Sequence, residues 1–316
     1  MGRTLRTSLP IVHHEGYVAP LPPGHRFPMQ KFHHIYKSLV SDGVVQDIEQ
    51  VFRPTLPDWS TLALVHDEDY LRKLRCLTLS VQEARKVGLP QTKEVINRCR
   101  RETGGTILAG ELALEHGLAA STAGGTHHAF PAFGSGFCVF NDLAVAAMAY
   151  LEKQMVNKVL IVDLDVHQGD GTAAIFGTNK NVFTFSMHCQ QNFPLQKCQS
   201  DLDISVEEGM KGKEYMKLLR ENLPSLLDAF CPDLVMYDAG VDVHKADLLG
   251  KLNLTDQCIL ERDLYVIDLV TRCHGVPCAC VVGGGYSTNM DALAKRHTIV
   301  HQAASRVWGS LRGSYL

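Results

Sequence analysis

Short apolar runs alternate with helical patterns along this chain. The apolar runs are rich in β-branched residues and lie at 118–123, 158–163, 182–187, 233–237 and 276–282. Apolar residues recur at helical spacing at 29–41, 106–116, 141–153, 214–230 (with a kink expected at Pro224), 256–273 and 289–308. Strands that are apolar on both faces are typical of parallel sheets buried between helices. The alternation therefore predicts an α/β fold, with one open, mostly parallel sheet and helices on both faces, in a single domain over 1–316.

Polar residues gather where four of these apolar runs end. The four segments are Gly124-Gly125-Thr126-His127-His128, Asp163-Leu164-Asp165-Val166-His167, Asp238-Ala239-Gly240-Val241-Asp242 and Gly283-Gly284-Gly285-Tyr286. In open α/β sheets, ligands bind beyond the carboxyl ends of the strands. We therefore expect the four segments to meet at one site, although they are spread over about half of the chain.

The second of these segments has the composition of a metal site. If the strand continues through it, Asp163, Asp165 and His167 point to one side, because side chains alternate along a strand. Three ionisable groups on an apolar strand are costly unless they are paired or bind a metal. With Asp242 from another strand end, two carboxylates and one imidazole leave coordination open, as in a catalytic site. The alternative is a strand that ends early, with the Asp residues as solvated caps.

Two further motifs could supply acid–base and oxyanion chemistry. The chain has three tandem His pairs, and only His127-His128 follows a Gly-Gly turn after an apolar run. A neutral imidazole can accept a proton from an activated water, and an imidazolium can donate one to a leaving amine. Each ring needs an acceptor that fixes its tautomer, and Asp163 and Asp170 are the nearest spare carboxylates. Tyr286 could direct its hydroxyl at an oxyanion, or its preceding glycines could form a turn alone.

Composition narrows the function classes. Of the 316 residues, 45% are hydrophobic and 21% are charged, which is enough apolar material for a large core. The net charge of −3 gives no overall attraction to nucleic acid, and no apolar run approaches the roughly 18 residues that span a bilayer. We therefore expect the protein to bind neither nucleic acid nor a membrane. Ten cysteines without a CxxC pair, and a start without an apolar signal core, favour the cytoplasm or nucleus over secretion.

Together, the motifs resemble those of the histone deacetylase family. The resemblance spans about residues 10 to 310 and depends on five ordered motifs: Gly125 to His128, Gly136-Phe137-Cys138 with Asn141-Asp142, Asp163 to Gly171, Asp238 to Asp242, and Gly283 to Tyr286. The chain length and the segment His25 to Met29 look closest to the compact class IV members and their prokaryotic relatives. One departure is Asp170, where some class IV members have Asn.

The resemblance implies an arginase/deacetylase fold and metal-dependent hydrolysis of acyl-lysine amides on proteins or peptides, with a role in chromatin regulation. It implies Zn²⁺ at Asp165, His167 and Asp242, although these ligands do not distinguish Zn²⁺ from Fe²⁺. His127 and His128 become the general base and acid, oriented by Asp163 and Asp170, and Tyr286 becomes the oxyanion partner. We expect a monomer or a weak homo-oligomer.

The resemblance also implies two further sets of residues. An acyl-lysine tunnel would be lined by Gly136, Phe137, Phe193 and Leu249. A structural K⁺ would be held by main-chain oxygens of Asp163, Asp165, His167 and Met187 and by the side chains of Asp163 and Ser186.

Three alternatives compete with this interpretation. A ureohydrolase would use two Mn²⁺ ions and more bridging carboxylates than the one three-ligand set found in the sequence. A non-catalytic scaffold should have lost a catalytic residue, and none is missing. A polyamine deacetylase would carry an acidic residue at the tunnel rim, where this chain has Leu249.

The acyl chain length is a separate question. Small residues that could open a cavity for long fatty acyl groups cluster near the His pair: Gly124, Gly125, Gly134, Ser135 and Gly136. Glycines also serve tight turns, and that alternative stays open here.

Overall fold

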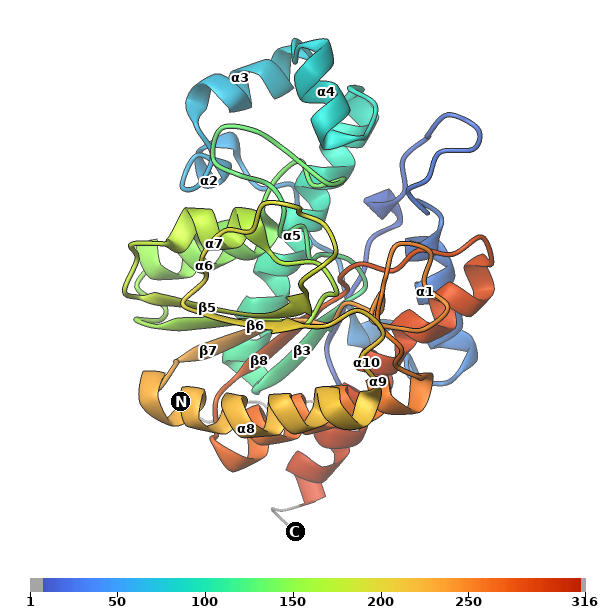
Figure 1. The fold of residues 1–316 in the computed structure, drawn as a ribbon, viewed down its shortest axis with the longest axis vertical. Coiled ribbons are helices and arrows are strands. Elements are labelled where there is room, and N and C mark those ends of the chain that lie inside the picture. Colours follow the sequence, from blue (N-terminus) through green and yellow to red (C-terminus); the bar gives the residue numbers. More distant parts are fainter. Residues whose placement is uncertain (1–7, 314–316) are drawn as a thin grey trace.

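One sheet of eight parallel strands forms the centre of the computed structural model, which describes residues 8–313 (Figure 1). The strands are β1 (Ile11–Val12), β2 (Val51–Phe52), β3 (Leu118–Ser121), β4 (Val159–Asp163), β5 (Val182–Cys189), β6 (Leu202–Val206), β7 (Leu234–Asp238) and β8 (Cys278–Val281). Their order is β2-β1-β3-β8-β7-β4-β5-β6, and every neighbouring pair is parallel. The predicted fold class is therefore confirmed. The first seven residues, part of the segment on which the signal-peptide prediction was made, lie outside the described residues.

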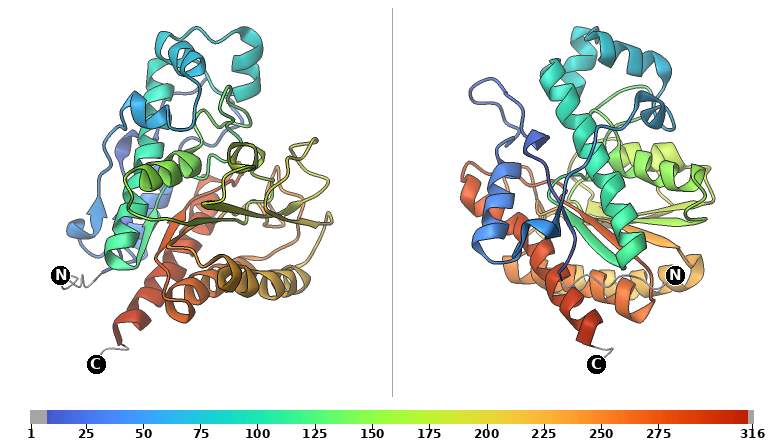
Figure 2. Two further views of the ribbon diagram at one scale, coloured as in Figure 1. Left: turned by 90° about the vertical axis from the view of Figure 1, so that its left-hand side faces the viewer. Right: turned by 180° about the vertical axis from the view of Figure 1, so that it is seen from behind.

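Helices cover both faces of this sheet (Figures 1 and 2). One face carries α5 (Lys93–His116), α6 (Asp142–Glu152) and α7 (Asp170–Phe176). The other carries α8 (Gly212–Phe230), α9 (Asp256–Asp268) and α10 (Met290–Gly313), and α1 (Lys31–Ser41) packs against α10. Among these described helices, none is long and apolar enough to cross a membrane.

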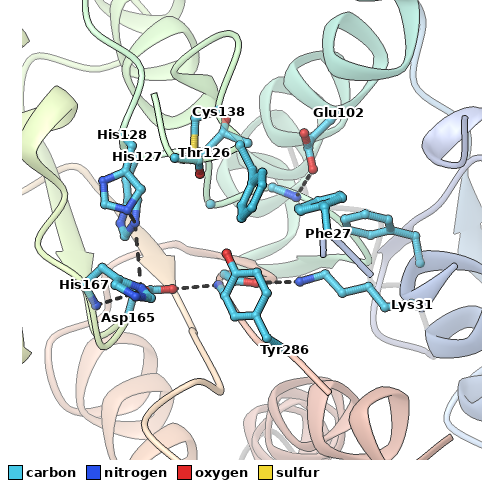
Figure 3. Close-up of a pocket in the computed structure, with 17 residues that line it drawn as sticks. Phe27, Lys31, Glu102, Thr126, His127, His128, Cys138, Asp165, His167 and Tyr286 are labelled. Carbon is cyan, nitrogen blue, oxygen red and sulfur yellow. Dashed lines mark hydrogen bonds and ion pairs between the residues drawn. The ribbon is translucent and has the colours of Figure 1, made fainter. Parts of the chain in front are cut away.

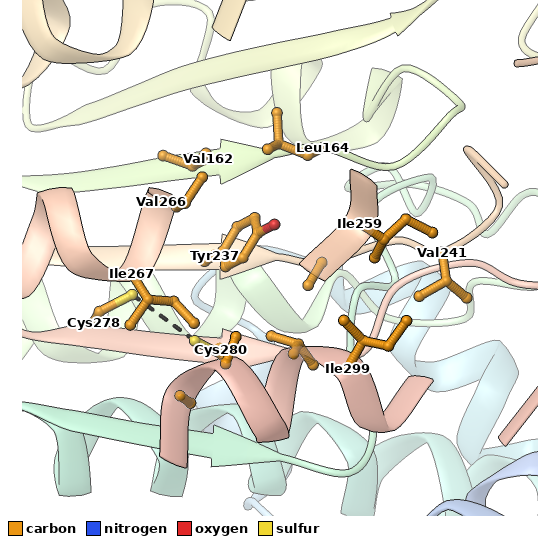
Figure 4. Packing of buried hydrophobic residues seen from close by; sticks show 14 of the residues in the cluster. Val162, Leu164, Tyr237, Val241, Ile259, Val266, Ile267, Cys278, Cys280 and Ile299 are labelled. Atoms are coloured by element: carbon orange, nitrogen blue, oxygen red, sulfur yellow. Dashed lines mark hydrogen bonds between the residues drawn. The ribbon is translucent and has the colours of Figure 1, made fainter. Parts of the chain in front are cut away.

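Side chains of the inner strands alternate between the two layers. Leu160 and Val162 join the apolar cluster beneath α8, α9 and α10, part of which Figure 4 shows. Val159 and Ile161 join a second cluster with α5 and α6. Both sets are buried, which explains why the strand sequence is apolar without interruption.

A smaller helical layer lies beyond the strand ends. It comprises α2 (Trp59–Leu62), α3 (Glu68–Cys76), α4 (Val81–Val87) and the short 3-10 turn Glu15–Tyr17. The 3-10 turn Ile48–Gln50 instead precedes β2, at the opposite edge of the sheet. Phe32, Tyr70, Leu71 and Phe140 share a third apolar cluster in the helical layer. This layer lies above the edge of the sheet where the polar segments gather (Figure 1).

Several predicted elements differ from those observed. The helix predicted at 106–116 begins at Lys93, where the Thr92 hydroxyl caps it by accepting from the Val95 N–H at 3.3 Å. Gly104 and Gly105 lie inside this helix. Glycine is needed at position 105 because a Cβ there would lie 2.1 Å from the Tyr17 hydroxyl. They interrupt the apolar pattern that marks a helix.

Other differences follow from short or exposed elements. Strands β1 and β2 have two residues each, and β6 is largely half-buried, so none forms an apolar run. The short helices α2, α3, α4 and α7 were also not predicted. Helix α8 continues through Pro224, and the predicted helix at 256–273 ends at Asp268, followed by a π-helical turn over Leu269–Cys273.

A fully buried arginine joins two strand ends to helix α9. The Arg262 Nη1 donates to the carbonyls of Leu164 at 3.1 Å and Gly240 at 2.8 Å, which follow β4 and β7. Its Nε pairs with Asp263 at 2.9 Å, and Asp263 also accepts from the Tyr237 hydroxyl at 2.6 Å. Arg262 therefore fixes two loops that carry site residues.

We expect Arg262→Met to lower the free energy of unfolding by about 3–5 kcal/mol, because it leaves a buried carboxylate unpaired. Arg220→Met is the matched control, since its 2.6 Å pair with Glu261 is about half exposed. That variant should lose less than about 1 kcal/mol. Urea unfolding followed by circular dichroism measures both, and equal losses would contradict the role of Arg262.

Candidate active site

The four polar segments meet at the carboxyl ends of β3, β8, β7 and β4, which are neighbours in the sheet. A pocket opens there, and Figure 3 shows the residues that line it. They are Phe27, Lys31, Phe32, Glu102, Gly124, Gly125, Thr126, His127, His128, Gly136, Phe137, Cys138, Asp165, His167, Gly283, Gly284 and Tyr286.

Asp165, His167 and Asp242 offer three buried ligand atoms to a metal ion. The His167 Nδ1 lies 2.9 Å from Asp165 Oδ1 and 3.2 Å from Asp242 Oδ2. Ligand atoms around a tetrahedral Zn²⁺ are about 3.3 Å apart, so this spacing fits a divalent cation. Asp242 Oδ2 is buried without a hydrogen-bond partner, and a cation would compensate it.

The backbone brings these ligands together in a way that the sequence pattern did not predict. Strand β4 ends at Asp163, so the expected alternation through His167 is wrong. The loop after β4 instead turns back on itself, with the Asp165 N–H donating to Asp163 Oδ1 at 3.0 Å. Asp165 stays buried in this loop, which also excludes the alternative of solvated caps.

A second buried group contains His127, Asp163 and Asp238. The expectation of a single three-ligand set is therefore wrong. The two groups share no residue, whereas a two-metal ureohydrolase site needs bridging carboxylates. In addition, Asp163 Oδ2 already pairs with His127 Nδ1 at 2.7 Å. The second group therefore favours the imidazole–carboxylate pair over a second cation.

Asp238 is a site residue to which the sequence analysis assigned no role. Both of its carboxyl oxygens are buried without a hydrogen-bond partner, and one lies 3.8 Å from His127 Nδ1. Burial, and then the neighbouring charge of Asp163, raise the pKa of Asp238 well above its ordinary value, which favours the neutral acid. The register of the strands could have indicated this residue, because Asp238 on β7 is paired with Asp163 on β4.

The two histidines differ in their charge. His127 Nε2 lies 3.1 Å from His128 Nε2, and His128 Nδ1 lies 2.6 Å from Asp170 Oδ1. Burial alone lowers the pKa of His127, but the carboxylates of Asp163 and Asp165 outweigh it and raise that pKa well above the ordinary value. Burial and the charge of His127 lower the pKa of His128 to about 4. The two environments thus favour the protonated form of His127 and the neutral form of His128.

Two residues at the start of α6 hold the His loop in place. The Asn141 side-chain amide donates to the carbonyls of His127 at 3.3 Å and Ala129 at 3.2 Å. The Asp142 carboxylate accepts from the Thr126 N–H and hydroxyl, both at 2.7 Å. The sequence analysis quoted both residues as a motif without assigning them this role.

Aromatic side chains surround the entrance to the site. The rings of Phe193 and His128 lie 4.8 Å apart between centroids, and those of Phe137 and Tyr286 lie 6.1 Å apart. Gly136 allows this closeness, since a Cβ there would lie 2.7 Å from the His128 ring. Phe193 is 40% exposed, which suits a position at the rim.

Asp247 connects the backbone of Leu249, which is not among the residues that line the pocket, to that of Tyr286, and the sequence analysis did not identify it. Its Oδ1 accepts from the N–H groups of Leu249 and Gly250, both at 2.9 Å. Its Oδ2 accepts from the Tyr286 N–H at 2.7 Å. Three backbone donors therefore occupy this carboxylate, which leaves it poorly placed to bind a substrate ammonium.

Of the predicted K⁺ residues, Asp163 and Ser186 are paired in register between β4 and β5, Met187 follows on β5, and Asp165 and His167 lie in the loop after β4. The Ser186 hydroxyl and the His188 Nδ1 lie 3.0 Å apart. Both Asp163 oxygens already accept hydrogen bonds. The ion itself stays a prediction.

An open parallel sheet that carries this His pair and this Asp–His–Asp group at its strand ends defines a protein of the arginase/deacetylase class. A model of the histone deacetylase domain matches residues 25–303, and the chain belongs to the histone deacetylase family. The predicted resemblance is therefore confirmed, and the family is one of deacetylase hydrolases.

Relatives of the chain come from bacteria and plants. It is 50% identical over 299 residues to an uncharacterised protein of Picosynechococcus sp., covering 95% of this chain and 99% of that protein. It is 32% identical over 272 residues to histone deacetylase 2 of Arabidopsis thaliana, covering 83% and 70%. It is 28% identical over 261 residues to the acetoin utilization protein AcuC of Staphylococcus aureus, covering 76% and 67%. The predicted prokaryotic relatives are thus found, while the class IV label stays a prediction.

We expect Asp242→Asn to reduce bound metal from about one ion per chain to near zero, because it removes one of three charged or imidazole ligands. Asp228→Asn is the control, since that side chain is 76% exposed and lies near the end of α8, outside the residues that line the pocket. Elemental analysis after gel filtration measures the metal content. An Asp242→Asn protein that keeps stoichiometric metal would contradict the ligand assignment.

Proposed function

We propose that the protein hydrolyses acyl-lysine amides on proteins or peptides with a divalent cation at Asp165, His167 and Asp242. Zn²⁺ is the cation we expect, with Fe²⁺ as the alternative. The observation that carries this proposal is the position of three buried ligand atoms beside a His pair in which each ring has its own carboxylate. The identity of the metal, the acyl-lysine substrate and the cellular compartment, which is the cytoplasm or the nucleus, are all parts of the proposal.

The residues divide the chemistry among them. When bound, the cation would polarise the amide carbonyl and make a water molecule more acidic. The His127–His128 pair takes the proton from the attacking water, and Asp163 and Asp170 hold the two rings in their tautomers. The hydroxide adds to the carbonyl carbon, the carbon–nitrogen bond breaks, and His128 delivers the proton to the departing lysine amine.

Tyr286 stabilises the charge that develops on the carbonyl oxygen. Burial, and then the carboxylates of Asp242 and Asp165, raise the pKa of Tyr286 well above its ordinary value, so its hydroxyl stays a neutral donor. The rings of Phe137 and Phe193 pack against the four-carbon stem of the substrate lysine. K⁺ at Asp163 and Ser186 would support the same strand ends.

Longer acyl groups would extend into the pocket beyond the ligands. Gly124, Gly125 and Gly136 line this pocket, as the cavity hypothesis requires. Gly134 and Ser135 do not line it. A Cβ at Gly134 would instead lie 2.7 Å from the Tyr70 hydroxyl, so Gly134 serves close packing. A Cβ at Gly124 would likewise lie 2.8 Å from Asp142 Oδ2, and one at Gly125 would lie 2.7 Å from Asp238 Oδ1, so these glycines also serve close packing. Activity on long-chain acyl-lysine therefore stays a prediction.

We expect Tyr286→Phe to keep fold and metal content and to lower kcat about 10²–10³-fold, the usual effect of removing one oxyanion donor. Hydrolysis of an acetyl-lysine peptide by metal-loaded protein, with and without chelator, is the measurement. Tyr265→Phe on α9 is a control away from the pocket. An unchanged kcat in Tyr286→Phe would remove this hydroxyl from the mechanism.

We expect the protein to prefer an acetyl-lysine peptide over acetylated spermidine, because Leu249 carries no charge and Asp247 is occupied by backbone donors. Leu249→Glu should shift the ratio of kcat/KM toward the polyamine. The neighbouring Leu248 is 61% exposed, so Leu248→Glu tests whether any added charge has this effect. A wild-type protein that clearly prefers the polyamine would overturn the assignment.

A further inference from the structure

Lys31 on α1 is a buried lysine in the pocket that the proposed mechanism does not use. Only 3% of it is exposed, and its ammonium lies on the opposite side of Tyr286 from the His pair (Figure 3). Its Nζ donates to the Gly283 carbonyl at 3.2 Å. Among residues 8–313, no other acceptor binds this ammonium and no carboxylate lies within 4.0 Å of it. Two of its three N–H bonds are therefore unpaired.

The carboxylates around Lys31 are already occupied. Glu102, in the same pocket wall, binds the Arg98 guanidinium through both oxygens, at 2.5 and 2.7 Å. Asp165 and Asp242 are assigned to the cation. Burial lowers the pKa of Lys31 to about 8, so the ammonium form still dominates at pH 7. A buried positive charge without a paired anion is costly and favours an anionic ligand.

Aromatic rings partly compensate this charge. The Nζ lies 5.9, 5.3 and 5.8 Å from the ring centroids of Phe27, Phe32 and Tyr286. Such contacts attract a cation but accept no conventional hydrogen bond from it. The rings therefore hold the ammonium in place while its free N–H bonds remain available to a ligand.

The position of Lys31 relative to the ligands defines what it can reach. Gly283 accepts from Lys31, and the next residue, Gly284, donates to Asp165 Oδ2 at 2.6 Å. The Gly283 carbonyl and the Gly284 N–H belong to the same peptide group. The Lys31 Nζ therefore lies within about 9 Å of Asp165 Oδ2, an oxygen of a proposed metal ligand. A substrate lysine that enters between Phe137 and Phe193 would direct its acyl group past the ligands toward this ammonium.

We propose that Lys31 selects acyl-lysine substrates whose acyl chain ends in a carboxylate, such as succinyl-lysine and glutaryl-lysine. This inference rests on the proposed hydrolysis of acyl-lysine. In these acyl groups, the terminal carboxylate lies about 4 to 6 Å from the amide carbonyl carbon, which suits an ammonium just beyond the ligands. Water adds across the amide as before, and the products are the free lysine amine and a dicarboxylic acid.

A plain alkyl chain of the same length lacks this interaction. It would cover the two unpaired N–H bonds of Lys31 with methylene groups and exclude the water that solvates them. The carboxylate would instead form charge-assisted hydrogen bonds, each stronger than a neutral one. The chain end, more than the chain length, should therefore decide which acyl group is removed.

The test compares acyl groups on one peptide: acetyl, succinyl, valeryl, glutaryl and plain acyl chains up to fourteen carbons. We expect the wild-type kcat/KM for glutaryl to exceed that for the equally long valeryl by about 10- to 100-fold. Lys31→Met should reduce this ratio at least about tenfold, and Lys31→Arg should retain most of it. Lys37→Met removes an exposed lysine from the same helix and should leave the ratio unchanged. Thermal unfolding checks that each variant is folded.

Binding to the metal-free protein gives a second measurement that does not depend on turnover. Calorimetry should show tighter binding of the glutaryl peptide than of the valeryl peptide, with the difference lost in Lys31→Met. If no acyl peptide is hydrolysed but this difference is found, the proposed function fails while the role of Lys31 stands.

Two outcomes would overturn the inference. One is a valeryl preference in both assays that Lys31→Met does not change, which would make Lys31 a structural cation. The other is the absence of a glutaryl preference together with Lys31-dependent inhibition by free acetate, which would assign Lys31 to the released product.

Discussion

Burial of acidic side chains is the constraint on which this site depends. Asp163, Asp165, Asp238 and Asp242 lie at or just beyond the ends of two adjacent strands, and none is more than 3% exposed. Carboxylates this close repel one another and lose their hydration. Each therefore needs its own compensation, and the arrangement of the site follows from how that compensation is supplied.

The compensation differs from one carboxylate to the next. Burial raises the pKa of Asp163, and the His127 ring and the Asp165 N–H oppose this by favouring its charged form. Asp165 accepts from the Gly284 N–H at 2.6 Å, and Asp242 from the Val166 N–H at 2.9 Å, so each retains oxygen lone pairs for a cation. Asp238 has no donor and is favoured as the neutral acid. Neighbouring aspartates thus take distinct roles because their hydrogen-bond donors differ.

The glycines of the sequence motifs allow backbone and carboxylates to approach one another. A Cβ at Gly284 would lie 2.0 Å from Asp242 Oδ2, and one at Gly283 would lie 2.2 Å from Asp238 Oδ1. Any side chain there would displace a site carboxylate. The glycines therefore define the shape of the site as well as its turns, and their spacing in the sequence carries information about the acids opposite them.

The sequence predicted what depends on periodicity and missed what depends on tertiary contact. Strands buried on both faces, such as β4 and β7, were found because burial makes their sequence uniformly apolar. Asp238 was quoted without a role and Lys31 was missed, because a single buried polar residue has no pattern. Lys31 has the sequence context of an ordinary polar position on an amphipathic helix. The Asp163–His167 segment was grouped correctly for the wrong reason, since a loop and not strand alternation brings its ligands together.

One carboxylate holds both Tyr286 and the predicted rim residue Leu249, which in the proposed mechanism would couple substrate selection to the chemistry. The Tyr286 N–H donates to Asp247, and its carbonyl accepts from the Leu248 N–H at 3.1 Å. The same carboxylate accepts from the Leu249 N–H at 2.9 Å. The Tyr286 ring in turn contacts the Lys31 ammonium on the inner side. In the proposed mechanism, a substrate that displaces Leu249 or the Lys31 ammonium would therefore also displace the Tyr286 hydroxyl, the proposed oxyanion donor. Discrimination between acyl groups should accordingly be expressed in kcat as well as in KM, because both ends of the pocket act on the same tyrosine.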